Sequence, residues 1–291
     1  MTHERTEGIP EASLRPLRGW HAGHYFYRFD RAQLRRLGPN ELSDGCRAFE
    51  TVLNPTSEKA PSRLQSLTIS GHKADFAVIA LDADPRVVNG VHQRLLACPL
   101  GAALVPTWSF ISLTEVSEYL PTLEQYGHEL ASQGLDPAGE EYRAKLKQFE
   151  RRLEIMHRQR LTPDLPTWPA VCFYPMNKRR QADANWFLLS FADRSRLMAQ
   201  HGESGMKFAG KVTQLITVAL GLDDWEWGVT LWARNPEFLK DIVYQMRFDE
   251  ASARYAEFGP FYYGQLASAQ EILAHCRIGG REAQADAGSS A

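Results

Sequence analysis

Tyr174, Lys178, His201 and Gln214 are the residues of this chain whose types and positions could do chemistry. Tyr174 ends an apolar stretch and Lys178 opens the cationic run that follows, a combination that suits recognition and oxidation of a carboxylated substrate. His201 closes a predicted helix, where a neutral imidazole could bind a metal. Gln214 shares one face of a predicted strand, residues 211–218, with apolar residues, so its amide could face a ligand cavity.

Each of the four residues also has a purely structural explanation. Tyr174 could pack at a strand end, and Lys178 could belong to a solvated surface with the two arginines that follow it. His201 could cap the carboxyl end of its helix. Gln214 could be a core amide bonded to neighbouring backbone. Residue type and spacing leave both explanations open at all four positions.

The rest of the sequence excludes several classes of protein. It has no P-loop, no GxGxxG opening a helix, no G-x-S-x-G turn and no H-E-x-x-H. The four cysteines form no CxxC pair, which argues against a zinc knuckle, a thioredoxin-type site or a disulfide framework. A net charge of −2 gives no whole-chain attraction to nucleic acid or anionic membranes. Residues 1–18 lack the apolar run of a secretory signal, and no stretch of about 18 apolar residues could span a membrane. We therefore expect a cytoplasmic protein.

The elements that must position these residues occur in two similar sets. A strand over residues 74–81 is followed by Asp84-Pro85, which opens a helix, and a strand over residues 225–232 is followed by Asn235-Pro236 and another helix. The two prolines lie 151 residues apart, a spacing that fits a duplicated domain. Each copy reads β-α-β-β-α-β. We predict an α+β fold with two ferredoxin-like repeats per subunit, of the dimeric α/β-barrel type, with antiparallel sheets and helices packed outside.

The repeats divide the chain into four parts. Residues 19–135 form a first repeat without a cofactor, and residues 167–275 form a second repeat that carries the chemistry. Residues 136–166 are predicted to be a linking helix and loop, because Leu146, Phe149, Leu153 and Met156 recur at helical spacing in a charged stretch. Residues 279–291 are mostly Gly, Ala, Ser and charged residues, which predicts a disordered tail.

The second half of the chain closely resembles coproheme decarboxylases of the Firmicute type, within the chlorite dismutase superfamily. The resemblance rests on Cys172-Phe-Tyr-Pro-Met-Asn-Lys-Arg-Arg180, Asn185-Trp-Phe-Leu-Leu-Ser190, His201-Gly202, Ala209-Gly-Lys-Val-Thr-Gln-Leu-Ile-Thr217, Gly221-Leu-Asp-Asp-Trp-Glu-Trp-Gly-Val-Thr-Leu231 and Met246-Arg-Phe-Asp-Glu-Ala-Ser-Ala-Arg254. The first half resembles the family more loosely, through residues 71–76 and 105–112.

The resemblance implies an activity and an assembly. Members convert Fe-coproporphyrin III (coproheme) to protoheme (heme b) with hydrogen peroxide, so the iron porphyrin is both substrate and redox cofactor. Two propionates lose carbon dioxide and become vinyl groups by way of a tyrosyl radical. The subunit is usually part of a homopentamer, and transient contact with a ferrochelatase is a further expectation.

The resemblance also implies roles for individual residues. His201 falls at the proximal iron ligand, Gln214 at the distal glutamine, Tyr174 at the radical-forming tyrosine and Lys178 beside the reacting propionate. The remaining residues would line the propionate side of the pocket: Arg158, Arg160, Met176, Arg247 and Ser252. Their cations would hold the carboxylates of the substrate.

The sequence departs from the family at four positions. Met206 stands where relatives often carry an arginine, which would weaken one propionate contact unless Lys207 replaces it. Trp108 and Phe110 stand where tyrosines are frequent, so hydrogen bonds from that strand are in doubt. Asn177 replaces a frequent aspartate, a change expected to matter little.

Three other functions remain open on the sequence. A chlorite-degrading enzyme of the same superfamily would place a distal arginine over the iron, and Gln214 is uncharged. A heme carrier or peroxidase-like protein would bind the porphyrin without decarboxylating it, and would need no oxidisable phenol beside Lys178. A duplicated α+β interaction module without a cofactor requires His201 and Gln214 both to be structural.

Overall fold

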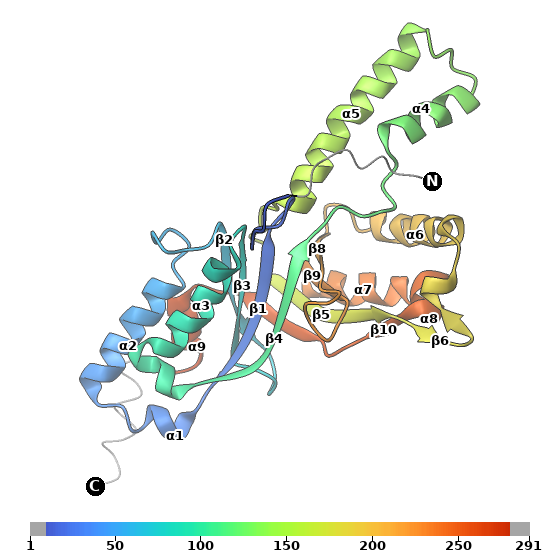
Figure 1. Ribbon diagram of the computed structural model, residues 1–291. Coiled ribbons are helices and arrows are strands. Elements are labelled where there is room, and N and C mark those ends of the chain that lie inside the picture. Colours follow the sequence, from blue (N-terminus) through green and yellow to red (C-terminus); the bar gives the residue numbers. More distant parts are fainter. Residues whose placement is uncertain (1–9, 280–291) are drawn as a thin grey trace.

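A closed antiparallel β-barrel forms the centre of the molecule (Figure 1), which is a computed structural model describing residues 10–279. The strand order is β10-β5-β11-β2-β3-β1-β4-β8-β9, and β9 pairs with β5 to close the ring. β10 and β11 pair with successive parts of β5. The strands are β1 (His21–Phe29), β2 (Arg63–Ile69), β3 (Phe76–Asp82), β4 (Leu104–Thr114), β5 (Ala170–Lys178), β8 (Val212–Val218), β9 (Trp227–Ala233), β10 (Ala256–Phe258) and β11 (Tyr262–Leu266).

The two predicted repeats are each one half of this barrel. β1, β2, β3 and β4 belong to the first repeat, with α2 (Pro39–Val52) and α3 (Pro85–Ala97) on its outer face. β5, β8, β9, β10 and β11 belong to the second, with α6 (Phe191–Met206), α7 (Pro236–Met246) and α8 (Glu250–Tyr255) outside. Short elements complete the chain: α1 (Arg31–Leu34), η1 (Pro99–Ala103), β6 (Arg180–Gln181), β7 (Ala184–Asn185) and η2 (Trp186–Leu188). The predicted α+β fold of two ferredoxin-like repeats is confirmed.

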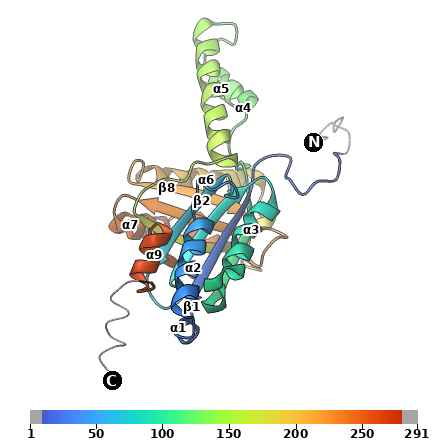
Figure 2. The ribbon, with the colours of Figure 1, turned by 90° about the vertical axis from the view of Figure 1, so that its left-hand side faces the viewer.

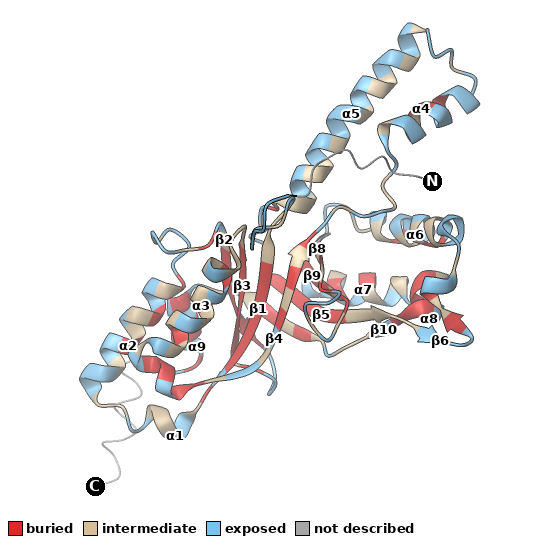
Figure 3. Ribbon diagram, viewed as in Figure 1, coloured by how far each residue is buried: buried red, intermediate tan, exposed pale blue. Residues whose placement is uncertain are grey.

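Alternation along the strands divides the apolar residues into an inner and an outer layer. The barrel interior is filled by large side chains, among them Phe26, Phe110, Phe173, Trp232 and Tyr262. The outer face of the first repeat forms a separate core beneath α2 and α3. The outer face of the second repeat forms a third cluster with α7. Figure 3 shows that burial concentrates on the strands and the helix faces next to them.

The last helix, α9 (Ala269–His275), packs on the first repeat although its residues fall within the range that the sequence assigned to the second. Ile272 and Leu273 are buried in the outer core of the first repeat, against α2 and β2. β11 and β2 are neighbours in the sheet, so the chain leaves β11 beside the first repeat. The predicted tail, residues 279–291, lies outside the described residues apart from Gly279.

A helical hairpin of α4 (Leu123–Ser132) and α5 (Glu140–Leu161) extends away from the barrel (Figures 1 and 2). α5 confirms the helix predicted between the repeats, and α4 lies in the range assigned to the first repeat. Tyr126 of α4 stacks on Phe149 of α5, with ring centroids 4.0 Å apart. No helix within residues 10–279 is both long and apolar enough to span a membrane.

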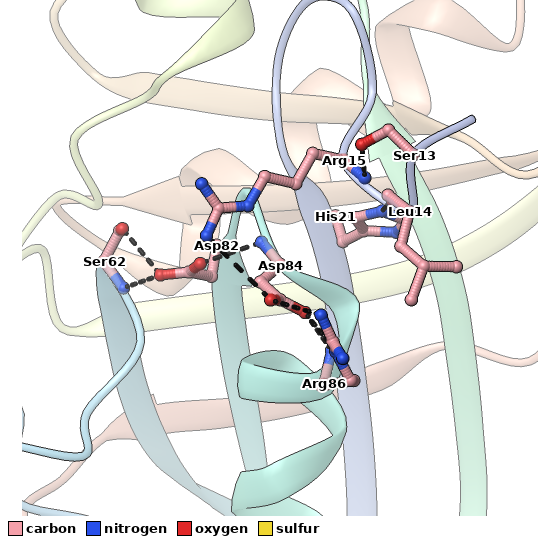
Figure 4. A network of polar contacts seen from close by, with 8 residues as sticks. All are labelled: Ser13, Leu14, Arg15, His21, Ser62, Asp82, Asp84 and Arg86. Carbon is pink, nitrogen blue, oxygen red and sulfur yellow. Dashed lines mark hydrogen bonds and ion pairs between the residues drawn. The ribbon is translucent and has the colours of Figure 1, made fainter. Parts of the chain in front are cut away.

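Asp84 shows how the sequence starts a helix. Its side chain accepts a hydrogen bond from the Arg86 backbone N–H and caps α3, and Pro85 takes the first helical position. The Arg86 side chain pairs with the same carboxylate, and Arg15 approaches it within 4.0 Å (Figure 4). Asn235 caps α7 in the same way, followed by Pro236, so both predicted helix starts are confirmed.

Candidate functional site

Strand register brings Tyr174, Met176, Lys178 and Gln214 onto the same outer face of the second repeat. The first three alternate along β5 and therefore point to one side. Cys172 of β5 pairs with Leu231 of β9, and Leu231 pairs with Gln214 of β8, so Gln214 faces the same side two strands away. The sheet thus gathers a phenol, a thioether, an ammonium and an amide on the face beside α6 and α7.

Tyr174 is held by aromatic packing at the end of its strand, as expected if it had a structural role. Its ring stacks on Phe261 at 4.5 Å and tilts against Phe258 at 5.7 Å, and the residue is only 6% exposed. Burial raises the pKa of its phenol, and the Arg247 charge only partly opposes this, so the phenol is neutral at neutral pH. Its hydroxyl forms no hydrogen bond within residues 10–279 and is not among the sealed polar atoms. The oxygen therefore remains available to a ligand.

Lys178 is the last residue of β5 and lies under an indole. Its Nζ is 4.0 Å from the centroid of the Trp186 ring. Burial lowers the pKa of the ammonium to about 8, although the Asp249 and Glu226 carboxylates act in the opposite direction. A lysine with this pKa can hold or release a proton near neutral pH.

His201 is bonded to a buried carboxylate through one ring nitrogen. Its Nδ1 lies 3.1 Å from Oδ2 of Asp249, which is the N-cap of α8 and only 2% exposed. Burial would raise the pKa of Asp249, but the hydrogen bonds from His201 and Ser252 outweigh it and hold the pKa below its usual value. An ionised carboxylate only accepts hydrogen bonds, so Nδ1 is the donor, and in the neutral imidazole Nε2 carries the lone pair. Metal-binding histidines are oriented in this way.

The capping explanation for His201 does not match the structure. α6 continues five residues beyond it, to Met206, so the imidazole lies within the helix and its side chain is 27% exposed. Ser252, expected on the propionate side, lies beside His201: its hydroxyl is 3.4 Å from Nδ1 and donates to Asp249 at 3.3 Å. Ser252 therefore supports the imidazole in this structure.

Gln214 is exposed and is not a core amide. Its neighbours Val212 and Ile216 on the same face pack into the outer cluster, whereas its own side chain makes no hydrogen bond within residues 10–279. The backbone-bonded explanation is thus not what the structure shows. The amide is therefore exposed on the face that carries Tyr174.

The predicted propionate-binding cations come from two elements. Arg247 directly follows α7, and its guanidinium lies 3.9 Å from the centroid of Phe258, the residue that pairs with Met176. Arg158 and Arg160 lie in the last turn of α5, and burial lowers the pKa of Arg160. Within residues 10–279, neither side chain forms a hydrogen bond or ion pair.

The end of α5 is fixed at the same end of the barrel as Met176. Thr114, the last residue of β4, donates a hydrogen bond to the Leu161 carbonyl at 2.7 Å. Thr114 pairs with Thr217, which pairs with Gly228, which in turn pairs with Pro175 of β5. Register thus connects Arg158 and Arg160 to the end of the sheet from which Met176 and Lys178 project.

Three of the departures have clear positions. Trp108 and Phe110 face the barrel interior, where they pack against Phe26 and Phe173. A hydroxyl at either position would point away from the face that carries Tyr174. Met206 ends α6 and is 69% exposed.

Sequence reasoning missed two parts of the site, Asp249 and Trp186. Asp249 precedes Ser252 by three residues, which is an N-cap spacing, but its bond to His201 spans 48 residues of sequence. Trp186 lies in residues 185–190, one of the segments that resemble the family, yet nothing in the sequence predicts that its ring covers Lys178. Both contacts are tertiary.

The donor set fits a metal that brings most of its own ligands. Within residues 10–279, no group of three or more His, Cys, Asp or Glu side chains could hold a metal ion. One imidazole with a free Nε2 is sufficient for a porphyrin iron, which takes four ligands from the macrocycle. The cations around the site suit a carboxylated ring, and the exposed amide of Gln214 suits a polar ligand of the iron.

Comparison with known proteins adds three similarities. A family model described as chlorite dismutase matches residues 43–267. A novel heme-binding protein from Thermus thermophilus is 33% identical, with 91% of this chain and 99% of that chain covered and a TM-score of 0.71. A chlorite dismutase mutant from Candidatus Nitrospira defluvii is 15% identical, covers 89% of this chain and 95% of its own, and gives a TM-score of 0.66, a likeness of fold alone.

Proposed function

The chain belongs to the chlorite dismutase family, and from that premise we propose that it is a coproheme decarboxylase, which converts Fe-coproporphyrin III to heme b with hydrogen peroxide. The observation that carries the proposal is the placement of Tyr174, a neutral phenol with an unbonded hydroxyl, on the same sheet face as Lys178 and Gln214. Porphyrin binding alone requires no oxidisable side chain there.

Binding would use the imidazole and the cations. His201 would ligate the iron through Nε2, with Asp249 fixing the ring and increasing its basicity. Coproheme carries four propionates, and unpaired carboxylates in a partly buried site cost several kcal/mol. Lys178, Arg247, Arg158 and Arg160 would supply the opposing charge. We further propose that Met176 contacts the same edge of the ring, since it lies between Tyr174 and Lys178 on β5.

The chemistry would divide between the bound iron porphyrin and the protein. Iron porphyrin with hydrogen peroxide supplies a two-electron oxidant. Tyr174 would give up its phenolic hydrogen and then take a hydrogen atom from the β-carbon of a propionate. The carbon radical would pass a second electron to the bound oxidant as the C–C bond to the carboxylate breaks, which would leave a vinyl group and carbon dioxide. For each propionate, one peroxide and one proton are consumed and two waters form, so the atoms and electrons balance.

Lys178 would donate the proton that is consumed for each propionate. With a pKa of about 8, its ammonium form can pair with the propionate carboxylate and can also return a proton to the site. Tyr174 and Lys178 are four residues apart on one face of β5, so the edge of a porphyrin lying along the strand would meet both. Small displacements of such groups are costly, with roughly hundredfold losses for about 1 Å.

A second candidate function is porphyrin binding without decarboxylation, which the description of the Thermus thermophilus relative favours. One experiment separates the two. Purified protein is loaded with ferric coproheme and titrated with hydrogen peroxide, and the products are followed by chromatography and mass spectrometry. We expect two successive losses of carbon dioxide and hydrogen in the wild type.

Tyr174→Phe is the decisive variant. It should bind coproheme with unchanged stoichiometry and lower the decarboxylation rate by about 100-fold or more. Tyr25→Phe, at the corresponding position of the first repeat, is the matched control and should react normally. Normal turnover by Tyr174→Phe would disprove the radical role, and absence of any product from the wild type would leave only the binding function.

Assembly as a homopentamer and delivery of the porphyrin by a ferrochelatase are also proposals. Mass photometry of the full chain checks the first: a single species at five times the 32.9 kDa subunit mass is the expected result. Transfer of coproheme from a ferrochelatase faster than through free solution would support the second.

A further inference from the structure

Glu226 is a buried carboxylate, 7% exposed, that lies one residue before β9. Its Oε2 accepts a hydrogen bond from the Lys178 backbone N–H at 2.9 Å. Its Oε1 lies 3.4 Å from Nη1 of Arg180. Burying a carboxylate is costly unless it is paired and hydrogen-bonded, so both oxygens are committed to the segment that carries Lys178.

Asn177 forms a second contact between the end of β5 and Glu226. Its Oδ1 accepts the Glu226 backbone N–H at 2.8 Å. The backbone ladder between β5 and β9 ends at Met176 and Trp227, and these two side-chain bonds continue the pairing by one more step. A strand end normally frays when its ladder stops. Ala256 of β10 pairs with Lys178 on one side, and the contacts of Glu226 and Asn177 hold the end of β5 on the side of β9.

The Glu226 charge also acts on the Lys178 ammonium, since it partly opposes the effect of burial on the lysine pKa. Two carboxylates face it: Asp249 from the start of α8, and Glu226 from the start of β9. The third wall is the apolar ring of Trp186, from η2. Asp249 is already committed to His201 and Ser252. Glu226 has its side-chain contacts at the end of β5 instead, with the Lys178 backbone N–H and with Arg180.

We propose that Glu226 is a positioning residue for Lys178, fixing the direction in which the lysine leaves β5 and stabilising its ammonium form. What Lys178 does with its proton rests on the proposed function, but its position and charge do not. A merely structural Glu226 would need its hydrogen bonds and not its charge. Glutamine at this position keeps an oxygen that can accept the Lys178 N–H and removes the charge.

The test measures the Lys178 side chain in protein without porphyrin. Lysine labelled at Cε with ¹³C gives one resonance per lysine, and the spectrum of Lys178→Met identifies the one that belongs to Lys178. Titration of wild type and Glu226→Gln then gives its pKa in each. We expect the pKa to fall by about 0.5–1 unit in Glu226→Gln, because an opposing charge in a partly buried site is lost.

Glu257→Gln is the matched control. Glu257 pairs with Asn177 from the other side of β5, on β10, but is exposed, so water screens its charge. This variant makes the same chemical change one strand away and should leave the Lys178 pKa within about 0.2 unit. A drop equal to that of Glu226→Gln would show a general charge effect and overturn the proposal.

Asn177→Asp provides a rescue. An aspartate there can accept the same Glu226 backbone N–H and places a carboxylate next to Lys178. In the double variant Glu226→Gln with Asn177→Asp, the Lys178 pKa should recover at least half of the lost shift. Thermal midpoints within a few degrees across the set would confirm that each variant folds.

Decarboxylation provides a second readout. If the proposed function holds, the alkaline limb of the kcat profile should move to lower pH in Glu226→Gln by the same amount as the Lys178 pKa. An unchanged Lys178 pKa in Glu226→Gln would overturn the proposal, because the Glu226 charge would then not stabilise the ammonium form. A shifted pKa in a protein that forms no heme b would leave the positioning role intact and refute the proposed function.

Discussion

The two repeats place matching residues at matching positions on their outer faces, but only at the second repeat's positions do a lysine and a histidine stand where the first has phenylalanines. Tyr25 and Tyr174 are each the fifth residue of the first strand of their repeat. Phe29 ends β1 where Lys178 ends β5. The eleventh residue of α2 is Phe49 and the eleventh of α6 is His201. One scaffold thus carries a packed core in one half and a candidate site in the other.

The surroundings of Tyr25 and Tyr174 show how the two repeats differ. The hydroxyl of Tyr25 is sealed and has no hydrogen-bond partner within residues 10–279, and burial raises its pKa to about 12. Phe29 and Phe49 pack together with Phe76 above the same sheet face. In the second repeat the corresponding helix, α6, packs mainly on α7 and α8. The helix that corresponds to α2 therefore packs on neighbouring helices and does not seal the sheet face that carries Tyr174.

The largest effect that tests this comparison is on folding. Phe49→Ala should lower the free energy of unfolding by about 3–5 kcal/mol, because it leaves a cavity in a closed core. His201→Ala, at the corresponding position, should cost about 1–3 kcal/mol, because it leaves no cavity in a closed core but removes one hydrogen-bond partner of the buried Asp249. Urea unfolding of the porphyrin-free protein measures both. Equal costs would mean that the second repeat is packed as tightly as the first.

Inside the barrel the polar residue lies in the first repeat: the fourth residue of β1 is His24, and the fourth residue of β5 is Phe173. The buried imidazole predicts that stability depends on pH. The His24 and Phe173 rings stack at 4.4 Å, and burial lowers the pKa of His24 to about 3. Between pH 6.5 and 3 the unfolded chain binds a proton that the folded chain does not, so stability falls as pH falls. The loss is about 1.4 kcal/mol per pH unit, or about 3 kcal/mol at pH 4.

Unfolding of His24→Phe against pH checks this. The variant should lose the His24 part of the slope below pH 6.5, whereas His128→Gln, an exposed control, should keep it. If the slopes of wild type and His24→Phe coincide, then His24 does not carry the acid sensitivity.

The contact between His201 and Asp249 has no counterpart at Phe49 and predicts a smaller, ligand-dependent effect. Asp249→Asn should weaken coproheme binding by about 10- to 100-fold, since partners that orient a ligating histidine typically have this effect. The iron–histidine band in resonance Raman spectra should shift to lower frequency, because the imidazole becomes less basic. Asp224→Asn, on an exposed loop, should change neither. Unaltered spectra in Asp249→Asn would show that Asp249 only caps α8.

The smallest effect is on the two phenols themselves. Tyr25→Phe removes a buried hydroxyl without a partner among residues 10–279 and should stabilise the protein by about 1 kcal/mol. Tyr174→Phe should change stability by less than about 0.5 kcal/mol, because its hydroxyl is not sealed. Denaturant midpoints of the two variants give the comparison directly. A destabilised Tyr25→Phe would imply that its hydroxyl has a partner.

Periodicity and helix-start signals predicted the fold well because they are local. Asp84-Pro85 and Asn235-Pro236 both start helices, and the two sets of strands and helices form the two predicted repeats. The place of α9 could not be predicted in this way. Ile272 and Leu273 are apolar at helical spacing, but nothing local indicates which repeat they cover. That depends on the pairing of β11 with β2.

The site was predictable only in part, for the same reason. Strand alternation placed Gln214 on a mixed face, and register then brought it to the side of Tyr174. The His201 contact with Asp249 and the Lys178 contact with Trp186 join residues that approach each other only in the folded chain. The resemblance supplied the roles of His201 and Lys178, but it gave no warning that Ser252 would bond to Asp249.

The position of α9 has a consequence for synthesis of the protein. Ile272 and Leu273 complete the outer core of the first repeat, although they are among the last described residues of the chain. A ribosome releases the first repeat long before it releases these residues, and domains usually fold in order as they emerge. The first repeat must therefore wait with part of its core uncovered until α9 has been translated. Nascent chains stalled before residue 269 should bind holding chaperones or be cut by proteases, and chains released after residue 279 should not.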